Sequence, residues 1–538
     1  MKMTQMMTAA LLAATVALAQ TPAPDLSSNP APEHGEINPA LPTLFVAGDS
    51  TAAKNNGNPI QGWGEPFKDF FDPAAVNVVN RARGGRSSRT FITEGLWAGI
   101  LADLKAGDVV LIQFGHNDGG AINEEPPGSN RPLRARGSLP GLGDETAEID
   151  NAVTHQHEVV RTFGSYVRQM VADVEAKGAT PIVMSPTVRN IWKDGVVERG
   201  TGRYRQWSRT IAAQAKVPFL DLTRIVADLY QELGPEAVDG LYGPDHTHNN
   251  TPGAQFTAIQ VVSGLKGLRS KSVDVKPWLS AMGQAVRQDQ IGWLALPEPA
   301  DADLPTVFLI GDSTVRNGGG VGDGGQWGWG EPLAKDVLDP ASINVVNRAI
   351  GGLSSRTFFS QGHWERTLTM LKPGDWVVMQ FGHNDPAPYN DISRARGTIK
   401  GTGDEAIPVD NLLTGKLEIV HSYGWYLRRY IRDAKAKGAI PVVCTFIPRK
   451  SWKDGKVVRD SGGYAGWART IAEEEGVQLI DLNELAAARY DTMGEAAVEP
   501  MFADPHTHTS WAGAEINARI VGEALTAFPQ FPGKLQHQ

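Results

Sequence analysis

Four short polar blocks in this 538-residue chain combine residue types that can cleave an ester. They hold Ser50 in a Gly-Asp-Ser-Thr run, Gly85 in a Gly-Gly pair, Asn117 in a Gly-His-Asn-Asp run, and Asp245 three residues before His248. A serine hydroxyl becomes a nucleophile when an imidazole accepts its proton and a carboxylate orients that imidazole. A glycine amide and an asparagine side chain are suitable donors to the oxyanion of acyl transfer. Together the blocks supply every group that metal-free acyl transfer requires.

The blocks recur once along the chain, which indicates that one whole domain is present twice. The recurring pairs are residues 48–51 and 311–314, 62–66 and 328–332, 113–118 and 380–385, and 246–248 and 506–508. Their offset stays between about 260 and 267 residues, far longer than the repeats of solenoid proteins. We expect a first copy at residues 41–267 and a second copy at 305–530. A linker with a helical segment at 278–293 is expected between them, at 268–304.

Each copy alternates short apolar runs with helical patterns such as residues 162–177 and 423–437. Runs that are apolar throughout are typical of strands buried on both faces, and strand–helix alternation predicts a parallel sheet covered by helices. Ligands of such sheets bind at the carboxyl ends of the strands, where the polar blocks fall. The expected strands are residues 43–47, 76–80, 108–114, 180–185 and 217–221 in the first copy, and 306–310, 343–347, 375–381, 440–446 and 477–481 in the second.

The ordered blocks, found twice, resemble those of the SGNH/GDSL hydrolases. Within that group the chain is similar to the rhamnogalacturonan acetylesterases, through Gly-Asp-Ser-Thr, Gly85-Arg86-Ser87 and Asp245-His-Thr-His248. The resemblance implies a flavodoxin-like three-layer α/β/α sandwich with a five-stranded parallel sheet in each copy. It also implies a serine esterase that removes O-acetyl groups from pectic polysaccharide through an acyl-enzyme. An esterase for another acetylated glycan, such as xylan, or for a small ester is the alternative.

The resemblance also implies a role for each residue of the blocks. Ser50 is the implied nucleophile, and its own amide joins Gly85 and Asn117 in the oxyanion hole. His248 is the implied general base, oriented by Asp245. The corresponding residues of the second copy are Ser313, Gly352, Asn384, Asp504 and His508.

The second copy departs from this pattern at its last block. Pro505 stands where Asp245 aligns, so Asp504 precedes His508 by four residues instead of three. Residues four apart are also neighbours on a helical turn, but Pro505 disfavours the helical conformation at Asp504. Two interpretations stay open: a complete second triad, or a second domain that is a non-catalytic carbohydrate-binding module.

Histidines and tryptophans outside these roles have alternative interpretations. The histidines of the pairs His246/His248 and His506/His508 are two residues apart, a spacing that metal ligands on a strand can have. A metal-dependent hydrolase is therefore a third possibility. We nevertheless expect no metal or cofactor. His155 and His157 do not recur and are expected at the surface. The recurring tryptophans are expected to pack in the core more than to bind sugar. They are Trp63 and Trp329, Trp192 and Trp452, and Trp207 and Trp467.

Arginines occur in long Gly/Pro-rich loops after the third strand of each copy. They can bind the carboxylates of galacturonate through bidentate pairs, or pair with Asp144-Glu145 and Asp404-Glu405 in the same loops. Both interpretations stay open. The arginines are Arg131, Arg134 and Arg136 in the first copy and Arg394 and Arg396 in the second.

The N-terminus and the overall charge indicate where the protein acts. Lys2, an apolar stretch at 9–18 and Ala-Leu-Ala at 17–19 predict a signal peptide over 1–19, followed by a flexible leader over 20–40. No later run reaches the ~20 apolar residues of a membrane span. The net charge of −9 argues against nucleic-acid binding. We expect an exported bacterial protein, periplasmic or secreted, that acts on acetylated plant cell-wall polysaccharide, with its single Cys444 buried.

Overall fold

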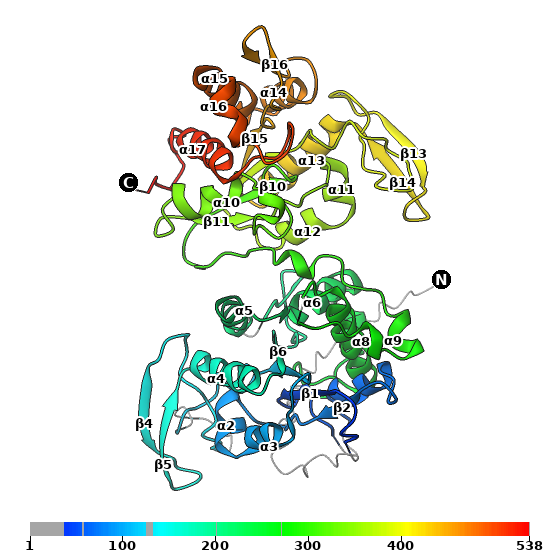
Figure 1. Cartoon of the computed structure of the whole chain (residues 1–538), viewed down its shortest axis with the longest axis vertical. Coiled ribbons are helices and arrows are strands. Elements are labelled where there is room, and N and C mark those ends of the chain that lie inside the picture. The colour runs from blue at the N-terminus through cyan, green and yellow to red at the C-terminus, as the bar shows by residue number, and fades with distance from the viewer. Residues whose placement is uncertain are drawn as a thin grey trace, which may run out of the picture. The chain divides into compact units, whose positions relative to one another are not determined.

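The computed structural model describes residues 37–55, 59–124, 128, 133–200, 202–270 and 272–536. The expected signal peptide and all but residues 37–40 of the expected leader lie outside this part of the chain. The chain divides between Gly292 and Trp293 into two compact units (Figure 1), and each is described by itself. Among the residues described, no helix combines the length and the apolar character that a membrane span needs.

Each unit is built on a five-stranded parallel sheet, which confirms the predicted strands to within a few residues. The first sheet has the order β2-β1-β3-β6-β9 and the second β11-β10-β12-β15-β18. The chain leaves β1 to form β2 on one side and then returns to form β3 on the other, so β1 and its counterpart β10 lie at the switch point where such sheets bind ligands. The strands are β1 (Thr43–Gly48), β2 (Asn77–Asn80), β3 (Val109–Gln113), β6 (Thr180–Met184) and β9 (Phe219–Leu220), then β10 (Thr306–Gly311), β11 (Asn344–Asn347), β12 (Trp376–Gln380), β15 (Ile440–Cys444) and β18 (Gln478–Ile480).

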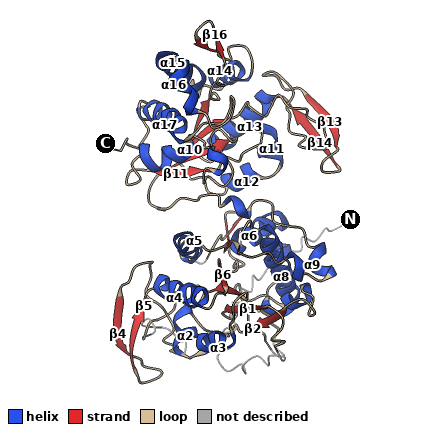
Figure 2. Ribbon diagram, in the orientation of Figure 1, coloured by secondary structure: helices blue, strands red, loops and turns tan. Residues whose placement is uncertain are grey.

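Helices cover both faces of each sheet (Figure 2) because successive residues of a buried strand point to opposite faces. In β1, Leu44 and Val46 join one core, and Phe45 and Ala47 join the other. The first core contacts α1 (Gly64–Phe67), α6 (Leu222–Leu233) and α8 (Thr251–Gly267), and the second contacts α2 (Ser88–Thr93), α3 (Leu96–Asp103), α4 (Phe163–Ala176) and α5 (Tyr204–Ala215). In the second unit η6 (Leu333–Val337), α15 (Leu482–Met493) and α17 (Trp511–Thr526) share one core, and α10 (Gly330–Pro332) contacts α17. The helices α13 (Tyr423–Ala436) and α14 (Tyr464–Glu474) pack on β15, and α11 (Ser355–Ser360) packs on α13 and α12 (His363–Leu368). Both units therefore have the expected three layers.

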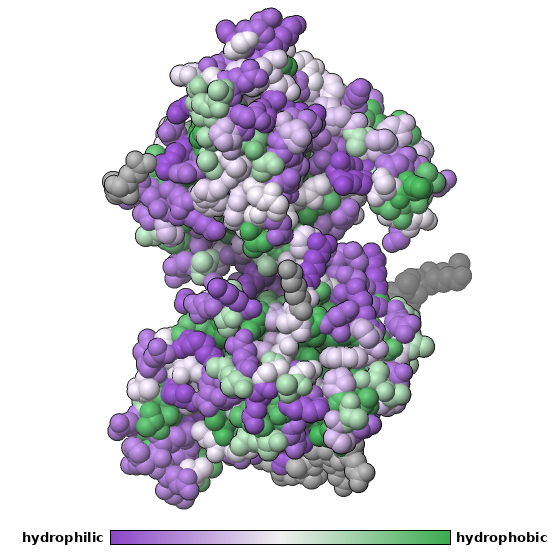
Figure 3. Space-filling model, viewed as in Figure 1, coloured by the Kyte–Doolittle hydropathy of each residue, from purple (hydrophilic) through white to green (hydrophobic). Residues whose placement is uncertain are grey.

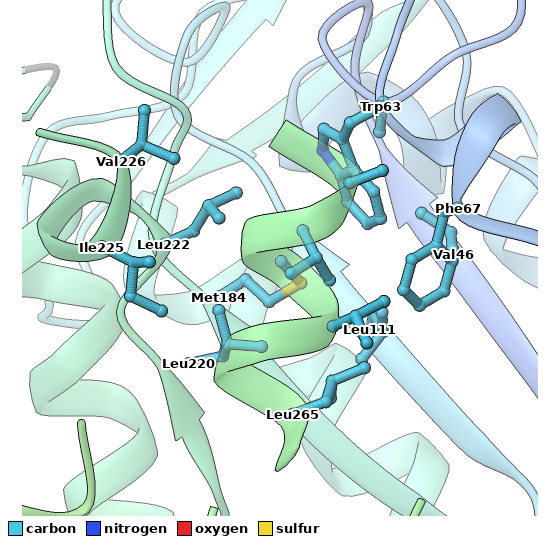
Figure 4. Packing of buried hydrophobic residues seen from close by; sticks show 14 of the residues in the cluster. Val46, Trp63, Phe67, Leu111, Met184, Leu220, Leu222, Ile225, Val226 and Leu265 are labelled. Atoms are coloured by element: carbon cyan, nitrogen blue, oxygen red, sulfur yellow. The ribbon is translucent and has the colours of Figure 1, made fainter. Parts of the chain in front are cut away.

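Leu111 on β3 lies in the middle of the first core, close to Leu220 and Leu265 (Figure 4). Its side chain has no exposed surface. We expect Leu111→Ala to lower the free energy of unfolding of the first unit by about 3 kcal/mol, through lost burial and the cavity that remains. Urea denaturation followed by tryptophan fluorescence measures this loss. Leu233→Ala, at a 48% exposed leucine, is the matched control and should change it by less than about 0.5 kcal/mol; equal effects of the two variants would contradict the assignment of the core.

Antiparallel hairpins form in the long segments that follow the third strand of each sheet, which the sequence suggested only as loops. One joins β4 (Thr146–Asp150) to β5 (His157–Arg161), and the other joins β13 (Ala406–Asn411) to β14 (Lys416–His421). Figure 3 shows apolar residues gathered at the end of the second hairpin, where Leu412, Leu413 and Leu417 are exposed. One further short hairpin follows the fourth strand of each sheet. It pairs β7 (Trp192–Lys193) with β8 (Val196–Val197) in the first unit, and β16 (Trp452–Lys453) with β17 (Lys456–Val457) in the second.

The expected linker at 268–304 is divided between the units instead of lying outside them. Leu279 is buried in the first core and forms a β-bridge with Phe71. Leu535 forms the same bridge with Leu338 in the second unit, so this segment does have a counterpart in the repeat. The helical segment is also shorter than expected, because only α9 (Ala281–Ala285) and two 3-10 turns form there.

Candidate active site

The structure brings Ser50, His248 and Asp245 together at the carboxyl end of the first sheet. Ser50 Oγ lies 2.9 Å from His248 Nε2, and His248 Nδ1 lies 2.8 Å from Asp245 Oδ2. Both ring nitrogens of His248 are therefore engaged, one by a hydroxyl and one by a carboxylate. This is the arrangement in which an imidazole removes a proton from serine while a carboxylate holds its tautomer.

Local turns position these side chains. The carboxylate of Asp49 accepts hydrogen bonds from the backbone N–H and the hydroxyl of Thr51, which fixes the turn that carries Ser50. Asp245 Oδ1 accepts from the backbone N–H groups of Thr247 and His248, which leaves Oδ2 for the imidazole. Burial raises the pKa of Asp245, but its hydrogen bonds and the charge of His248 outweigh this effect and lower the pKa to about 2. Asp245 is therefore an anion at the pH where His248 acts.

The second copy forms the same chain of contacts through Asp504, in spite of Pro505. Ser313 Oγ lies 2.9 Å from His508 Nε2, and His508 Nδ1 lies 2.5 Å from Asp504 Oδ2. Asp504 Oδ1 accepts from the backbone N–H groups of residues 506, 507 and 508, one more than Asp245 does. The extra residue is thus absorbed in a longer turn around the carboxylate, and the Asp–His–Ser geometry is complete.

The residues expected to form the oxyanion hole flank the serine in each copy. Gly85 lies beyond β2 with φ at +77°, and Gly352 lies beyond β11 with φ at +83°, a conformation that favours glycine. Within the described residues the backbone N–H groups of Ser50 and Gly85 donate no hydrogen bond. Asn117 uses one of its two amide hydrogens on the carbonyl of Arg86, 2.9 Å away, and keeps the other. Three donors are thus available to a developing oxyanion.

Asp118 joins the two segments that carry these donors. Its carboxylate accepts hydrogen bonds from the backbone N–H and the hydroxyl of Ser88 and from the hydroxyl of Ser138. Next to it, burial lowers the pKa of His116 to about 4, so its imidazole is neutral near pH 7 and shares a hydrogen bond with the hydroxyl of Thr187. Sequence reasoning assigned no role to Asp118 or Thr187. Only the recurrence of Asp118 at Asp385 was available as a signal.

The buried carboxyls of Asp118 and Asp385 give the protein a specific pH dependence. Burial raises the pKa of Asp118 to about 6 and that of Asp385 to about 7, whereas an unfolded aspartate titrates near 4. Between these values the native state holds protons that the unfolded state has released, so rising pH favours unfolding. We expect the stability of the wild type relative to Asp385→Asn to fall from pH 4 to pH 7, as measured by urea denaturation. The exposed Asp410→Asn is the control; a pH-independent difference for Asp385→Asn would contradict the argument.

A cavity of about 680 Å³ opens beside the second triad, and Ser313, His508, Gly352 and Asn384 line it. All the residues expected at the second site except Asp504 therefore face one space. Asp504 lies behind His508. The cavity is large enough for a sugar residue with its neighbours.

In the second copy, Arg394 and Arg396 of the long loop lie at this site and form no ion pair with Asp404 or Glu405. Arg396 donates to the carbonyl of Gly352 at 2.7 Å, and Arg136 to that of Gly85 at 3.4 Å. Arg394 lines the cavity. Asp144 pairs with Arg168 outside the loop, at 2.6 Å. Arg131 lies outside the described residues. Arg449, which precedes the recurring Trp-Lys-Asp-Gly segment and also lines the cavity, was missed although it recurs in register with Arg189.

The remaining candidates have structural positions. Trp63 and Trp329 are buried and donate to the glutamine of the neighbouring strand, and the other recurring tryptophans pack on cores or on tyrosine rings. Cys444 is buried in β15. His157 is exposed beside Asp150. No group of three or more His, Cys, Asp or Glu side chains with metal-binding geometry occurs in the described part of the chain.

Comparison with known proteins places both copies among acyl hydrolases. The sequence profile of the GDSL-like Lipase/Acylhydrolase family matches residues 46–256 and 309–516. The chain is 35% identical over 217 residues to the rhamnogalacturonan acetylesterase of Emericella nidulans, and the aligned region covers 40% of this chain and 81% of that protein. It is 34% identical over 224 residues to the probable rhamnogalacturonan acetylesterase YesY of Bacillus subtilis, covering 41% and 91%. It is 28% identical over 242 residues to the rhamnogalacturonan acetylesterase RhgT of the same organism, covering 42% and 90%.

Proposed function

Because this chain belongs to the GDSL-like lipase/acylhydrolase family and is a carboxylic ester hydrolase, we propose that it removes O-acetyl groups from pectic rhamnogalacturonan at two separate sites. The observation that carries the proposal is the uninterrupted contact from carboxylate to imidazole to serine hydroxyl in each copy. The names of the relatives support the substrate class. The two sites use Ser50, His248 and Asp245, and Ser313, His508 and Asp504.

The geometry supports an acyl-enzyme reaction in two steps. Ser50 Oγ attacks the acetyl carbonyl carbon while its proton passes to His248 Nε2, 2.9 Å away. The amides of Ser50 and Gly85 and the side chain of Asn117 stabilise the oxyanion. The protonated His248 then gives its proton to the departing sugar oxygen, which leaves acetyl-Ser50 and a free hydroxyl on the glycan. Water then attacks the acetyl-serine carbonyl carbon while His248 accepts its proton, and His248 returns that proton to Ser50 Oγ as the ester bond breaks and acetate leaves.

Acetate release from matched glycans tests the substrate class. We expect the full chain to release acetate from acetylated rhamnogalacturonan oligosaccharides with a kcat/KM at least about tenfold above that for acetylated xylo-oligosaccharides. The reverse order would replace the proposed substrate by xylan. Loss of activity with a chelator and its return with zinc would replace the serine mechanism by a metal-dependent one.

We also propose that the chain is exported and meets its polysaccharide outside the cytoplasm. The apolar stretch at 9–18 and the Ala-Leu-Ala at 17–19 support this proposal. Expression of the full chain in a bacterium should yield an extracytoplasmic protein whose N-terminal residue is Gln20. A cytoplasmic protein that retains residues 1–19 would contradict it.

A further inference from the structure

The two sites differ in charge at one matched position beside the catalytic cleft. Glu198 directly follows β8 in the first copy, and Val458 directly follows β17 in the second. The backbone N–H groups of both residues make the same 2.8 Å hydrogen bond, to the carbonyl of Ile191 and of Ser451. The positions are therefore equivalent in the fold, and only the side chain differs.

This position lies next to an arginine that each copy holds close to its triad. The residue after Arg189 donates its backbone N–H to the carbonyl of His246 at 2.7 Å, and the residue after Arg449 donates to His506 at 2.9 Å. These contacts fix both arginines against the His-Thr-His segments that carry the catalytic histidines. Arg449 lines the 680 Å³ cavity that contains Ser313.

In the first copy a carboxylate offsets the arginine. Burial raises the pKa of Glu198 by more than the nearby charges of Arg189 and His246 lower it, so the carboxyl group of Glu198 interacts electrostatically with both residues. In the second copy Val458 lines a neighbouring cavity of about 350 Å³ together with Arg449 and supplies no charge. Asp460 also lines that neighbouring cavity, but its two oxygens accept the backbone N–H groups of Gly463 and Ala465.

The side chains that line the catalytic cavity of the second copy carry a net positive charge. Arg394, Arg396 and Arg449 line it, and no aspartate or glutamate does so among the described residues. Arg396 is held by the carbonyl of Gly352. The guanidinium groups of Arg394 and Arg449 form no hydrogen bond or ion pair with any described residue. Two unpaired guanidinium groups beside an ester site are suited to a carboxylate of the substrate.

We infer that the second copy cleaves acetyl esters next to a free carboxylate, as on a uronic-acid residue, whereas the first copy favours neutral or esterified neighbours because Glu198 offsets Arg189. The inference rests on the proposed function and deepens it, since it divides acetylated substrates between the two sites by charge. The chemistry of recognition is a guanidinium–carboxylate pair that Glu198 weakens in the first copy and that Val458 leaves intact in the second.

Site-resolved protection of the full chain tests this division. Diethyl 4-nitrophenyl phosphate labels an activated serine, and peptide mass spectrometry measures the labelling of Ser50 and Ser313 separately in one sample. The protecting ligands are trigalacturonate and its methyl ester. We expect trigalacturonate to protect Ser313 at about tenfold lower concentration than Ser50, and the methyl ester to show no such preference.

Exchange of the matched residues provides the decisive variants. The quantity compared is the protecting concentration of trigalacturonate divided by that of its methyl ester, measured at one serine. Val458→Glu should raise this ratio at Ser313 about tenfold. Val458→Gln, which has the same length without the charge, should leave it within twofold of the wild-type value. Glu198→Gln should lower the ratio at Ser50. Equal ratios at both serines, or a ratio at Ser313 that Val458→Glu does not change, would overturn this inference and leave the proposed esterase function intact. Absence of labelling at both serines would overturn the proposed function on which it rests.

Discussion

Replacing Ser50 and Ser313 together by alanine is expected to reduce acetate release by at least about a thousandfold, because both nucleophiles are lost. Each serine hydroxyl lies 2.9 Å from its own imidazole, and alanine removes the oxygen atom that would accept the acetyl group. Each single variant should keep the activity of the other site. Acetate assays on acetylated rhamnogalacturonan, with wild type, both single variants and the double variant, measure these effects.

The control for this comparison is Ser270→Ala, because Ser270 is partly exposed and its hydroxyl contacts that of Ser272, which belongs to neither triad. It should match the wild type. If Ser50→Ala alone abolished activity, the second copy would be the binding module that the sequence left open. Full activity of the double variant would mean that neither serine is the nucleophile.

Asp504→Asn is expected to lower the kcat of the second site by about 10⁴-fold, as Asp245→Asn should in the first. An asparagine oxygen can still accept the backbone N–H groups of residues 506–508, so the turn survives. Its amide nitrogen then faces His508 Nδ1 and cannot accept a hydrogen bond from it, which forces the imidazole into the wrong tautomer. The fold is preserved and only the proton transfer is lost.

This prediction is measured in the Ser50→Ala background, where all turnover belongs to the second site. Asp410→Asn, on the exposed face of β13, is the matched control and should leave kcat unchanged. Circular dichroism should be the same for all variants. A kcat for Asp504→Asn close to that of its parent would show that the contact of Asp504 with His508 is not used in catalysis.

Much of the fold and of the site could be predicted because the chain repeats itself. The strands were found because they are apolar throughout, and the rim residues because polar blocks follow those strands twice. Asp504 could not be decided in advance, since Pro505 changes the local turn and only the three backbone N–H groups around Asp504 Oδ1 show how the turn closes.

Other features depend on contacts that no local pattern specifies. The hairpin of the second copy could not be predicted because Pro408 interrupts β13, which pairs with β14 alone and so tolerates a proline. The sequence after residue 267 reads as a linker because nothing in the residues around Leu279 indicates that it is buried against Phe71. Arg449 was missed for a similar reason, since a single recurring arginine shows its role only when the cavity is seen.

The most direct test of the central claim is to stop the enzyme during turnover and locate the acetyl group. The full chain is mixed with excess 4-nitrophenyl acetate, quenched in acid within the steady state, and digested for peptide mass mapping. We expect acetyl groups on the peptides that contain Ser50 and Ser313, and none there in Ser50→Ala with Ser313→Ala. Continued acetate release with no acetyl group on either serine would contradict the two-site acyl-enzyme mechanism.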